Sequence, residues 1–163
     1  MNPRLRSGLI VAVLHVALVG SLGAKMLVDR ATRPRVWAQV APFDPNLPIR
    51  GRYVRMAIEA PGDDSVRSVY QGHFKPVIRN DVLVFVPAGE LDGRSGSVQQ
   101  REGRYVVRLH EPLAFFIPEH VPDPSIRAAD EELWVEVTLP RRGAPRPIRL
   151  GVKRNGVLTP LDL

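Results

Sequence analysis

The chain has 163 residues, of which 44% are hydrophobic and 25% are charged, a balance typical of a globular protein with a packed core. This length fits one domain plus an appendage, and the absence of cysteine excludes a disulfide framework or a thiolate metal site. The formal net charge is +6, but few aromatic residues alternate with the basic ones, so we expect no nucleic acid partner.

A run of seventeen residues without a formal charge extends from Gly8 to Ala24. As a helix it spans about 26 Å, slightly less than a hydrocarbon layer of about 30 Å. Residues 26–28 are apolar and supply the difference, because Lys25 can extend its ammonium group to the lipid headgroups. The sequence therefore predicts a single-pass membrane protein in which residues 1–28 form an anchor in the lipid bilayer.

Two other interpretations of this run stay open. A cleaved signal peptide also begins with basic residues, here Arg4 and Arg6, but its best cleavage site, Ser21-Leu22-Gly23, fits the small-residue rule only weakly. A helix in the core of a soluble protein normally carries a polar face, whereas His15 is the one polar side chain between Leu9 and Val19. We expect His15 to form a local hydrogen bond or to face a partner helix.

The orientation of the anchor is not fixed by the positive-inside rule, because basic residues flank both of its ends. Arg4 and Arg6 precede the apolar run, and Lys25, Arg30, Arg33 and Arg35 follow it. A basic start before an apolar run resembles an export signal. We therefore expect a cytoplasmic N-terminus and a domain on the extracytoplasmic side.

Residues 29–35 are polar and contain Pro34, which predicts a linker, and residues 36–163 are expected to fold as one domain. The chain has 16 prolines and 13 glycines, and in this part they separate short β-branched runs typical of strands joined by turns. The sequence predicts an all-β domain, either a sandwich or a partly closed barrel. The expected strands are Val36–Val40, Arg52–Glu59, Val66–Tyr70, Val82–Val86, Ser97–Gln100, Tyr105–Leu109, Leu113–Ile117, Leu133–Leu139, Pro147–Lys153 and Val157–Leu158.

Two local signals refine this expectation. Asn155-Gly156 accepts the positive φ angles of a type I′ turn and predicts a terminal hairpin. Asp123 followed by Pro124 is typical of a helix start, so we expect one short helix over Ser125–Glu132.

Residues 36–58 read VWAQVAPFDPNLPIRGRYVRMAI, and a second element, Phe116-Ile117-Pro118-Glu119, follows later in the chain. Together these segments resemble the GDYXXLXY family of uncharacterised bacterial membrane-anchored proteins, and the resemblance covers roughly residues 36–163. The resemblance implies a membrane-tethered accessory domain that accompanies a multi-pass membrane protein. The motif residues, which we expect to be structural, are Asp44, Pro45, Gly51, Tyr53, Met56, Ile58, Phe116, Pro118 and Glu119.

Three positions depart from the family's motif. Arg52 stands in place of its aspartate, Met56 in place of its leucine and Ile58 in place of its last tyrosine. Chemistry that depends on that acid cannot be carried over. Because alternate residues of a strand face opposite sides, we expect Val54, Met56 and Ile58 to share the core face.

Two short pairs, His110-Glu111 and Glu119-His120, contain the residue types from which a zinc or manganese site is built. Their spacing fits no familiar metal motif, and neighbouring strand residues point to opposite faces. We therefore expect no metal, no cofactor and no catalytic residue.

The sequence favours a membrane-tethered, non-enzymatic accessory or interaction domain. One alternative is a membrane-held hydrolytic or metal-dependent enzyme that uses Glu119, His110 and His120. Another is a module that binds anionic lipid or polysaccharide through a basic run near the C-terminus. This run consists of Arg141, Arg142, Arg146, Arg149, Lys153 and Arg154.

Overall fold

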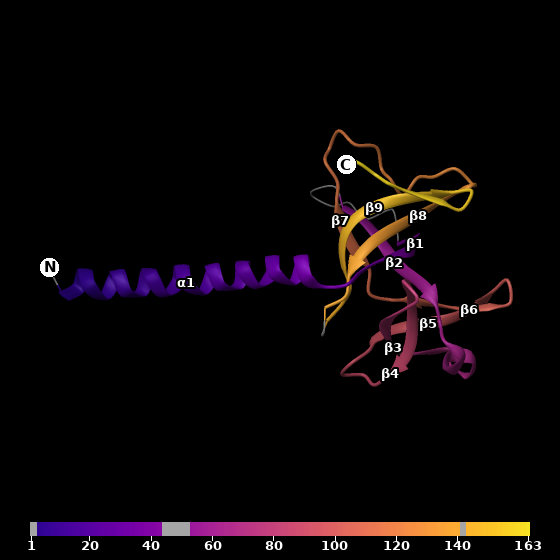
Figure 1. The fold of residues 1–163 in the computed structure, drawn as a ribbon, viewed down its shortest axis with the longest axis horizontal. Coiled ribbons are helices and arrows are strands. Elements are labelled where there is room, and N and C mark those ends of the chain that lie inside the picture. The colour runs from indigo at the N-terminus through magenta and orange to yellow at the C-terminus, as the bar shows by residue number, and fades with distance from the viewer. Residues whose placement is uncertain (1–2, 44–52, 141–142) are drawn as a thin grey trace. The chain divides into compact units, whose positions relative to one another are not determined.

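The computed structural model describes residues 3–43, 53–140 and 143–163. The chain divides into two units, an N-terminal helix up to Arg33 and a β domain from Pro34 onward. Figure 1 shows helix α1 and the strongly curled sheet of the β domain.

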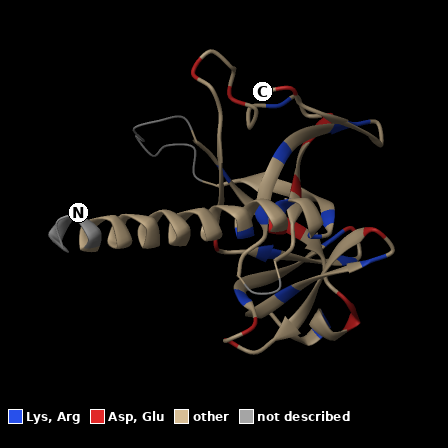
Figure 2. Ribbon diagram, turned by 60° about the vertical axis from the view of Figure 1, so that its left-hand side comes forward, with Lys and Arg blue, Asp and Glu red and all other residues tan. Residues whose placement is uncertain are grey.

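Helix α1 (Pro3–Thr32) is the first unit. Within it, Ser7–Thr32 form a candidate membrane span of 26 residues, in which an 18-residue window has a mean hydropathy of 2.0 and no buried residue. In Figure 2 the helix carries almost no charge colour along most of its length. By length and composition it can cross a membrane, as the sequence predicts.

The helix continues beyond the end of the expected anchor, so the linker predicted at residues 29–35 is helical in its first part. The guanidinium group of Arg33 donates to the carboxylate of Asp29 at 2.8 Å, and Thr32 Oγ1 donates to the carbonyl of Val28 at 2.7 Å. These contacts one turn apart stabilise the last turn of α1. Strand β1 begins at Arg35, which leaves Arg33 and Pro34 between the end of α1 and the start of β1.

The described residues of the second unit form an antiparallel sheet of ten strands. Nine of them follow the order β10-β9-β8-β1-β2-β6-β5-β3-β4, and β7 pairs with the first half of β2. The strands are β1 (Arg35–Pro42), β2 (Tyr53–Pro61), β3 (Gln71–Arg79), β4 (Val82–Ala88), β5 (Arg94–Arg101), β6 (Arg104–Leu109), β7 (Leu113–Phe116), β8 (Glu131–Thr138), β9 (Arg146–Arg154) and β10 (Val157–Pro160).

The sheet curls until one edge strand, β4, returns to the end of β2. A parallel bridge joins Gly62 to Phe85, and the amide of Asp63 donates to the carbonyl of Phe85 at 3.1 Å. Strand β2 makes this curl possible by pairing with β7 at its start and with β6 at its end. The all-β prediction is confirmed, and this arrangement is the partly closed form rather than a two-sheet sandwich.

The hydrophobic core lies on one face of the curled sheet. Val54, Met56 and Ile58 of β2 are buried in it, which confirms the face predicted from strand alternation. Ala57 and Glu59, on the other face of the same strand, are buried as well. The end of β2 is therefore covered on both faces.

Two predictions of local structure are wrong. Residues of the expected strand Val66–Tyr70 lie partly in a 3₁₀ helix, η1 (Asp64–Ser68), because the Asp63 side chain accepts a hydrogen bond from the amide of Ser65. The short helix expected over Ser125–Glu132 does not form. Asp123 accepts from the amide and the hydroxyl of Ser125 at 2.8 Å, as a helix cap does, but the chain turns there and enters β8 at Glu131.

Two-residue turns with positive φ angles close three hairpins of the sheet. In the last hairpin Asn155 has φ 50° and Gly156 has φ 81°, which confirms the predicted type I′ turn. The turn between β3 and β4 has Asn80 at φ 51° and Asp81 at φ 60°. The turn between β5 and β6 consists of Glu102 and Gly103.

The turn between β3 and β4 gives a stability prediction. At Asp81 a side chain is held in left-handed backbone, which costs an L-residue about 1 to 2 kcal/mol. Asp81→Gly creates the same Asn-Gly pair that closes the last hairpin. We expect it to raise the free energy of unfolding by about 1 kcal/mol, measured by urea denaturation. Gly156→Asp, the reverse change at the matching position, should lower that energy, and a stabilised Gly156→Asp variant would contradict the argument.

Asp63 gives a prediction that depends on pH. Hydrogen bonds from Ser65 are the main cause that lowers the pKa of Asp63, and the nearby Arg79 guanidinium adds to it. Asp63→Ala should lower the free energy of unfolding by about 1 kcal/mol at neutral pH, because a capping side chain is lost. Since folding lowers this pKa, the contribution is present above the unfolded pKa of about 3.9 and is lost as the pH falls through the folded pKa. Denaturation curves of the two proteins should therefore converge below about pH 4, and a constant difference down to pH 2 would contradict this.

Candidate functional site

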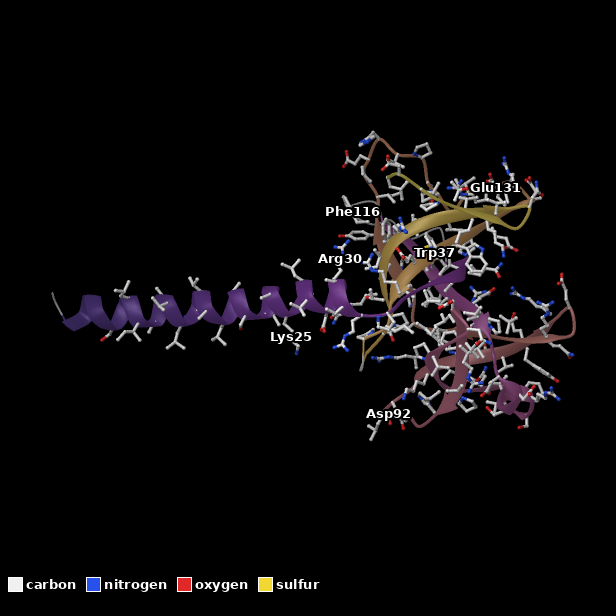
Figure 3. The ribbon with its side chains drawn as sticks, in the orientation of Figure 1. Lys25, Arg30, Trp37, Asp92, Phe116 and Glu131 are labelled. Atoms are coloured by element: carbon white, nitrogen blue, oxygen red, sulfur yellow. The ribbon has the colours of Figure 1, made fainter. Side chains whose placement is uncertain are left out.

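The two segments that carry the family resemblance lie side by side in the sheet. Strand β7 pairs with the start of β2, with Tyr53 opposite Phe116 and Met56 opposite Leu113. The rings of Tyr53 and Phe116 meet edge to face at 5.5 Å between centroids, and both side chains are about half exposed. Figure 3 labels Phe116 in this region of the domain.

The remaining motif residues are distributed differently. Met56 and Ile58 are buried in the core. Pro118 is half-buried and Glu119 is exposed in the loop after β7. Asp44, Pro45 and Gly51 lie outside the described residues, as does Arg52. Tyr53 and Phe116 are thus two motif residues that meet at the surface of the sheet.

The candidate metal-binding pairs do not come together in the described part of the chain. His110, which follows β6, approaches Ser95, with 3.2 Å between Nδ1 and Oγ. Glu111 forms an ion pair with Arg94 at 3.6 Å. Among residues 3–43, 53–140 and 143–163, no group of three or more His, Asp or Glu side chains is placed to hold a metal ion.

Basic side chains of β9 are largely engaged with acidic or aromatic neighbours inside the domain. Arg149 donates to Glu136 at 2.8 Å, and Arg154 pairs with both Asp130 and Glu131. Figure 2 shows blue and red segments intermixed over this part of the sheet. Within the described residues, Arg149, Lys153 and Arg154 of the basic run therefore have partners inside the domain, which weakens the interpretation of β9 as an anionic lipid site.

A groove with a volume of about 320 Å³ crosses the strands on the face opposite the core. We call it the tryptophan groove, because both tryptophans of the chain line it. Trp37 is labelled in Figure 3. The groove is lined by Trp37, Ala38, Gln39, Glu59, Ala60, Pro61, Val82, Leu83, Glu102, Arg104, Val106, Glu132, Trp134 and Lys153.

Strand register explains why these residues meet. Trp134 of β8 lies opposite Gln39 of β1, which in turn lies opposite Glu59 of β2. Residues two places away in a strand point to the same face, so Trp37 joins this row from β1. Side chains from three different strands are therefore brought together by pairing alone.

Both indole rings are held by their neighbours. A side chain at position 151 would meet the Trp37 ring at 2.8 Å, so glycine there lets the ring lie close to β9. The guanidinium group of Arg149 lies 5.4 Å from the centre of the Trp37 ring. Trp134 donates from Nε1 to Glu132 at 3.0 Å, and Lys153 Nζ lies 4.7 Å from its ring centre.

Glu59 is the buried charge of the groove, with a side chain that is 3% exposed. Arg101 donates to its two carboxylate oxygens at 2.7 and 3.3 Å, and Arg108 approaches at 3.6 Å. A buried carboxylate needs such partners to remain ionised without a large penalty. The arginines fix the position of Glu59.

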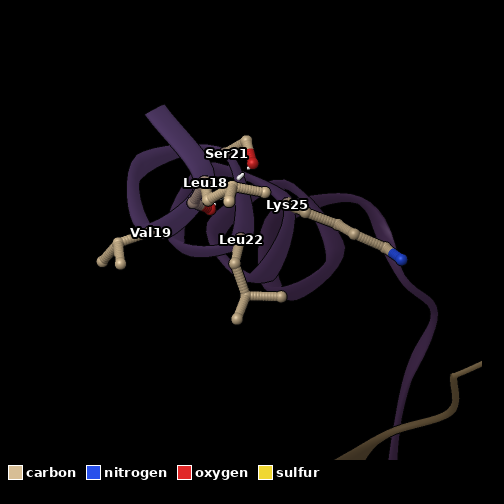
Figure 4. A pocket seen from close by; sticks show the side chains of 5 residues that line it. All are labelled: Leu18, Val19, Ser21, Leu22 and Lys25. Carbon is tan, nitrogen blue, oxygen red and sulfur yellow. Dashed lines mark hydrogen bonds between the residues drawn. The ribbon is translucent and has the colours of Figure 1, made fainter. Parts of the chain in front are cut away.

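The first unit carries a shallow apolar depression, shown in Figure 4, that is lined by Leu18, Val19, Ser21, Leu22 and Lys25. The hydroxyl of Ser21 donates to the carbonyl of Leu18 at 2.8 Å. His15 Nδ1 lies 2.8 Å from the carbonyl of Val11, which confirms the expected local hydrogen bond. These two polar side chains are satisfied within the helix, as a membrane environment requires.

No protein-family profile, no curated protein and no solved structure matches this chain. The likeness to the GDYXXLXY family thus rests on the motif residues themselves.

Proposed function

We propose that this protein is a membrane-tethered, non-enzymatic accessory domain that docks on a multi-pass membrane protein. The observation that carries the proposal is helix α1, whose 26-residue candidate span contains an 18-residue window with a mean hydropathy of 2.0 and exposes its large apolar side chains. Exposed leucine, isoleucine and valine side chains in such number are unfavourable in water. A bilayer removes them from water without any further partner.

The membrane tether also indicates the class of partner, namely another membrane protein. Anchoring raises the local concentration of the β domain at the bilayer, which favours weak interactions with other membrane proteins. Gly8, Gly20 and Gly23 have open space where a side chain would begin, and small residues of this kind permit close helix packing in membranes. The family resemblance points to the same class of partner.

Membrane fractionation tests the anchor. We expect the full-length protein to stay in the membrane pellet after carbonate extraction, and a chain that begins at Pro34 to be soluble with a β-type circular dichroism spectrum. N-terminal sequencing of the extracted protein should begin near Met1. A start at or just after Ala24 would show that the segment is a cleaved signal peptide.

The side of the membrane can be tested cleanly because the chain has no cysteine. Leu91 is fully exposed, so Leu91→Cys provides a single accessible thiol on the β domain. Labelling by a membrane-impermeant maleimide in intact cells is the expected result for an extracytoplasmic domain. Labelling only after lysis would place the domain in the cytoplasm.

Purification in mild detergent tests the partner. The full-length protein should bring down a multi-pass membrane protein, and replacement of residues 9–24 by polyleucine should weaken that recovery while leaving the protein in the membrane. Recovery of the full-length protein alone in several detergents would reject the docking proposal but not the anchor.

A further inference from the structure

The tryptophan groove combines two aromatic side chains, mixed charges and a small volume within the β domain. We infer that this groove binds a short neutral oligosaccharide. The inference goes beyond the proposed function and does not depend on it.

The size of the groove limits the ligand. Its volume of about 320 Å³ lies at the lower end of the range of ligand pockets, about 300 to 1,000 Å³. A sugar unit or two can enter it, whereas a folded protein segment cannot.

The aromatic groups suit a sugar ring. A pyranose has an apolar face of C–H groups that packs on a flat aromatic ring, and its edge carries hydroxyl groups. Trp37 and Trp134 both line the groove and are fixed by Arg149, Glu132 and Lys153. Rings held in place before the ligand arrives lose little conformational entropy on binding.

The polar groups suit hydroxyls rather than a charged ligand. The amide of Gln39 both donates and accepts, Glu102 and Glu132 accept, and Arg104 and Lys153 donate. The charges of the carboxylates of Glu102 and Glu132 balance those of the two cations, since Glu59 is already paired with Arg101 and Arg108. A ligand whose hydroxyl groups both donate and accept can form hydrogen bonds with these side chains. A polyanion would instead be repelled by the carboxylates.

Peptide ligands fit the same groove less well. Strands β1, β2 and β8, which form most of it, are paired on both sides, so their backbone groups are not available to an added strand. Trp134 Nε1 already donates to Glu132 and is not free to bind the carbonyl of a proline-rich peptide. A sugar needs neither of these contacts.

Intrinsic fluorescence tests the inference directly, because Trp37 and Trp134 are the chain's only tryptophans and both lie in the groove. The full-length protein, in lipid nanodiscs free of sugar-based detergent, is titrated with maltotriose, cellotriose and chitotriose. We expect a saturable change in emission with at least one of them. Trp37→Phe and Trp134→Phe each leave one reporter, and each single-tryptophan protein should still respond.

A matched pair of variants assigns the response to the groove. Gln39→Ala removes the central amide and should weaken binding by at least about tenfold, the size expected from losing hydrogen bonds to a buried polar ligand. Lys75→Ala, on the exposed side of β3, should bind as the wild type does. Equal thermal midpoints of the variants show that folding is unchanged.

Three results would overturn the inference. These are no saturable change with any of the three sugars, an unchanged affinity in Gln39→Ala, or saturation by a proline-rich peptide in place of sugars. If the protein binds sugar but carbonate extracts it from membranes, the sugar-binding inference stands and the proposed membrane anchor is rejected.

Discussion

Met56→Ala is expected to lower the free energy of unfolding by about 2 to 5 kcal/mol. Met56 is 0% exposed and lies in the core beneath the pairing of β2 with β7. Its removal loses the transfer free energy of the thioether chain and leaves a cavity that the surrounding strands can only partly fill. Urea denaturation of the β domain, with equal slopes for both proteins, measures the difference.

Leu91→Ala is the control for this prediction, because Leu91 is 100% exposed in the loop between β4 and β5. It should change the free energy of unfolding by less than about 0.5 kcal/mol. If Met56→Ala unfolds at the same urea concentration as Leu91→Ala, the side chain is not part of a packed core.

The alternation of apolar residues predicted most strands because it reports directly which side chains are buried. Val54, Met56 and Ile58 alternate with more polar residues, and the strand and its core face follow from that pattern. Alternation does not predict strand β3, because Gly72, His73 and Pro76 interrupt the pattern of apolar residues there. That strand forms because β4 and β5 pair with it on both sides.

Local capping signals were less reliable than patterns of burial. Asp123 makes the hydrogen bonds of a helix cap to Ser125, yet no helix follows it. Glu131 lies opposite Arg154 in the pairing of β8 with β9, so sheet formation determines the conformation there. Tertiary pairing overrides a local preference of about 1 kcal/mol.

The candidate site could not be predicted because it depends on strand order and register. Trp37 and Trp134 are 97 residues apart in the chain, and Gln39 joins them through pairing of β1 with β8. Nothing in the spacing of these residues indicates the contact. The one sequence signal was that both tryptophans fall in predicted strands, where their apolar neighbours face the opposite side.

Glu59→Ala is expected to have the second largest effect, a loss of about 2 to 3 kcal/mol in the free energy of unfolding. The carboxylate is buried and accepts from Arg101 at 2.7 Å, with Arg108 at 3.6 Å. Its removal leaves two guanidinium groups without their shared partner. The loss is smaller than for a fully buried pair, because both arginine side chains keep access to water.

Asp64→Ala is the matched control, because its ion pair with Arg67 is exposed on both sides. An exposed pair contributes about 0 to 1 kcal/mol and is screened by salt, whereas a buried carboxylate is screened much less. The cost of Glu59→Ala should therefore persist in 1 M sodium chloride, and any cost of Asp64→Ala should disappear there. In a double-mutant cycle, Arg101→Ala should have little further effect once Glu59 is removed. Additive losses at the two positions would show that Glu59 and Arg101 act independently, and that the arginines do not hold the carboxylate in the groove.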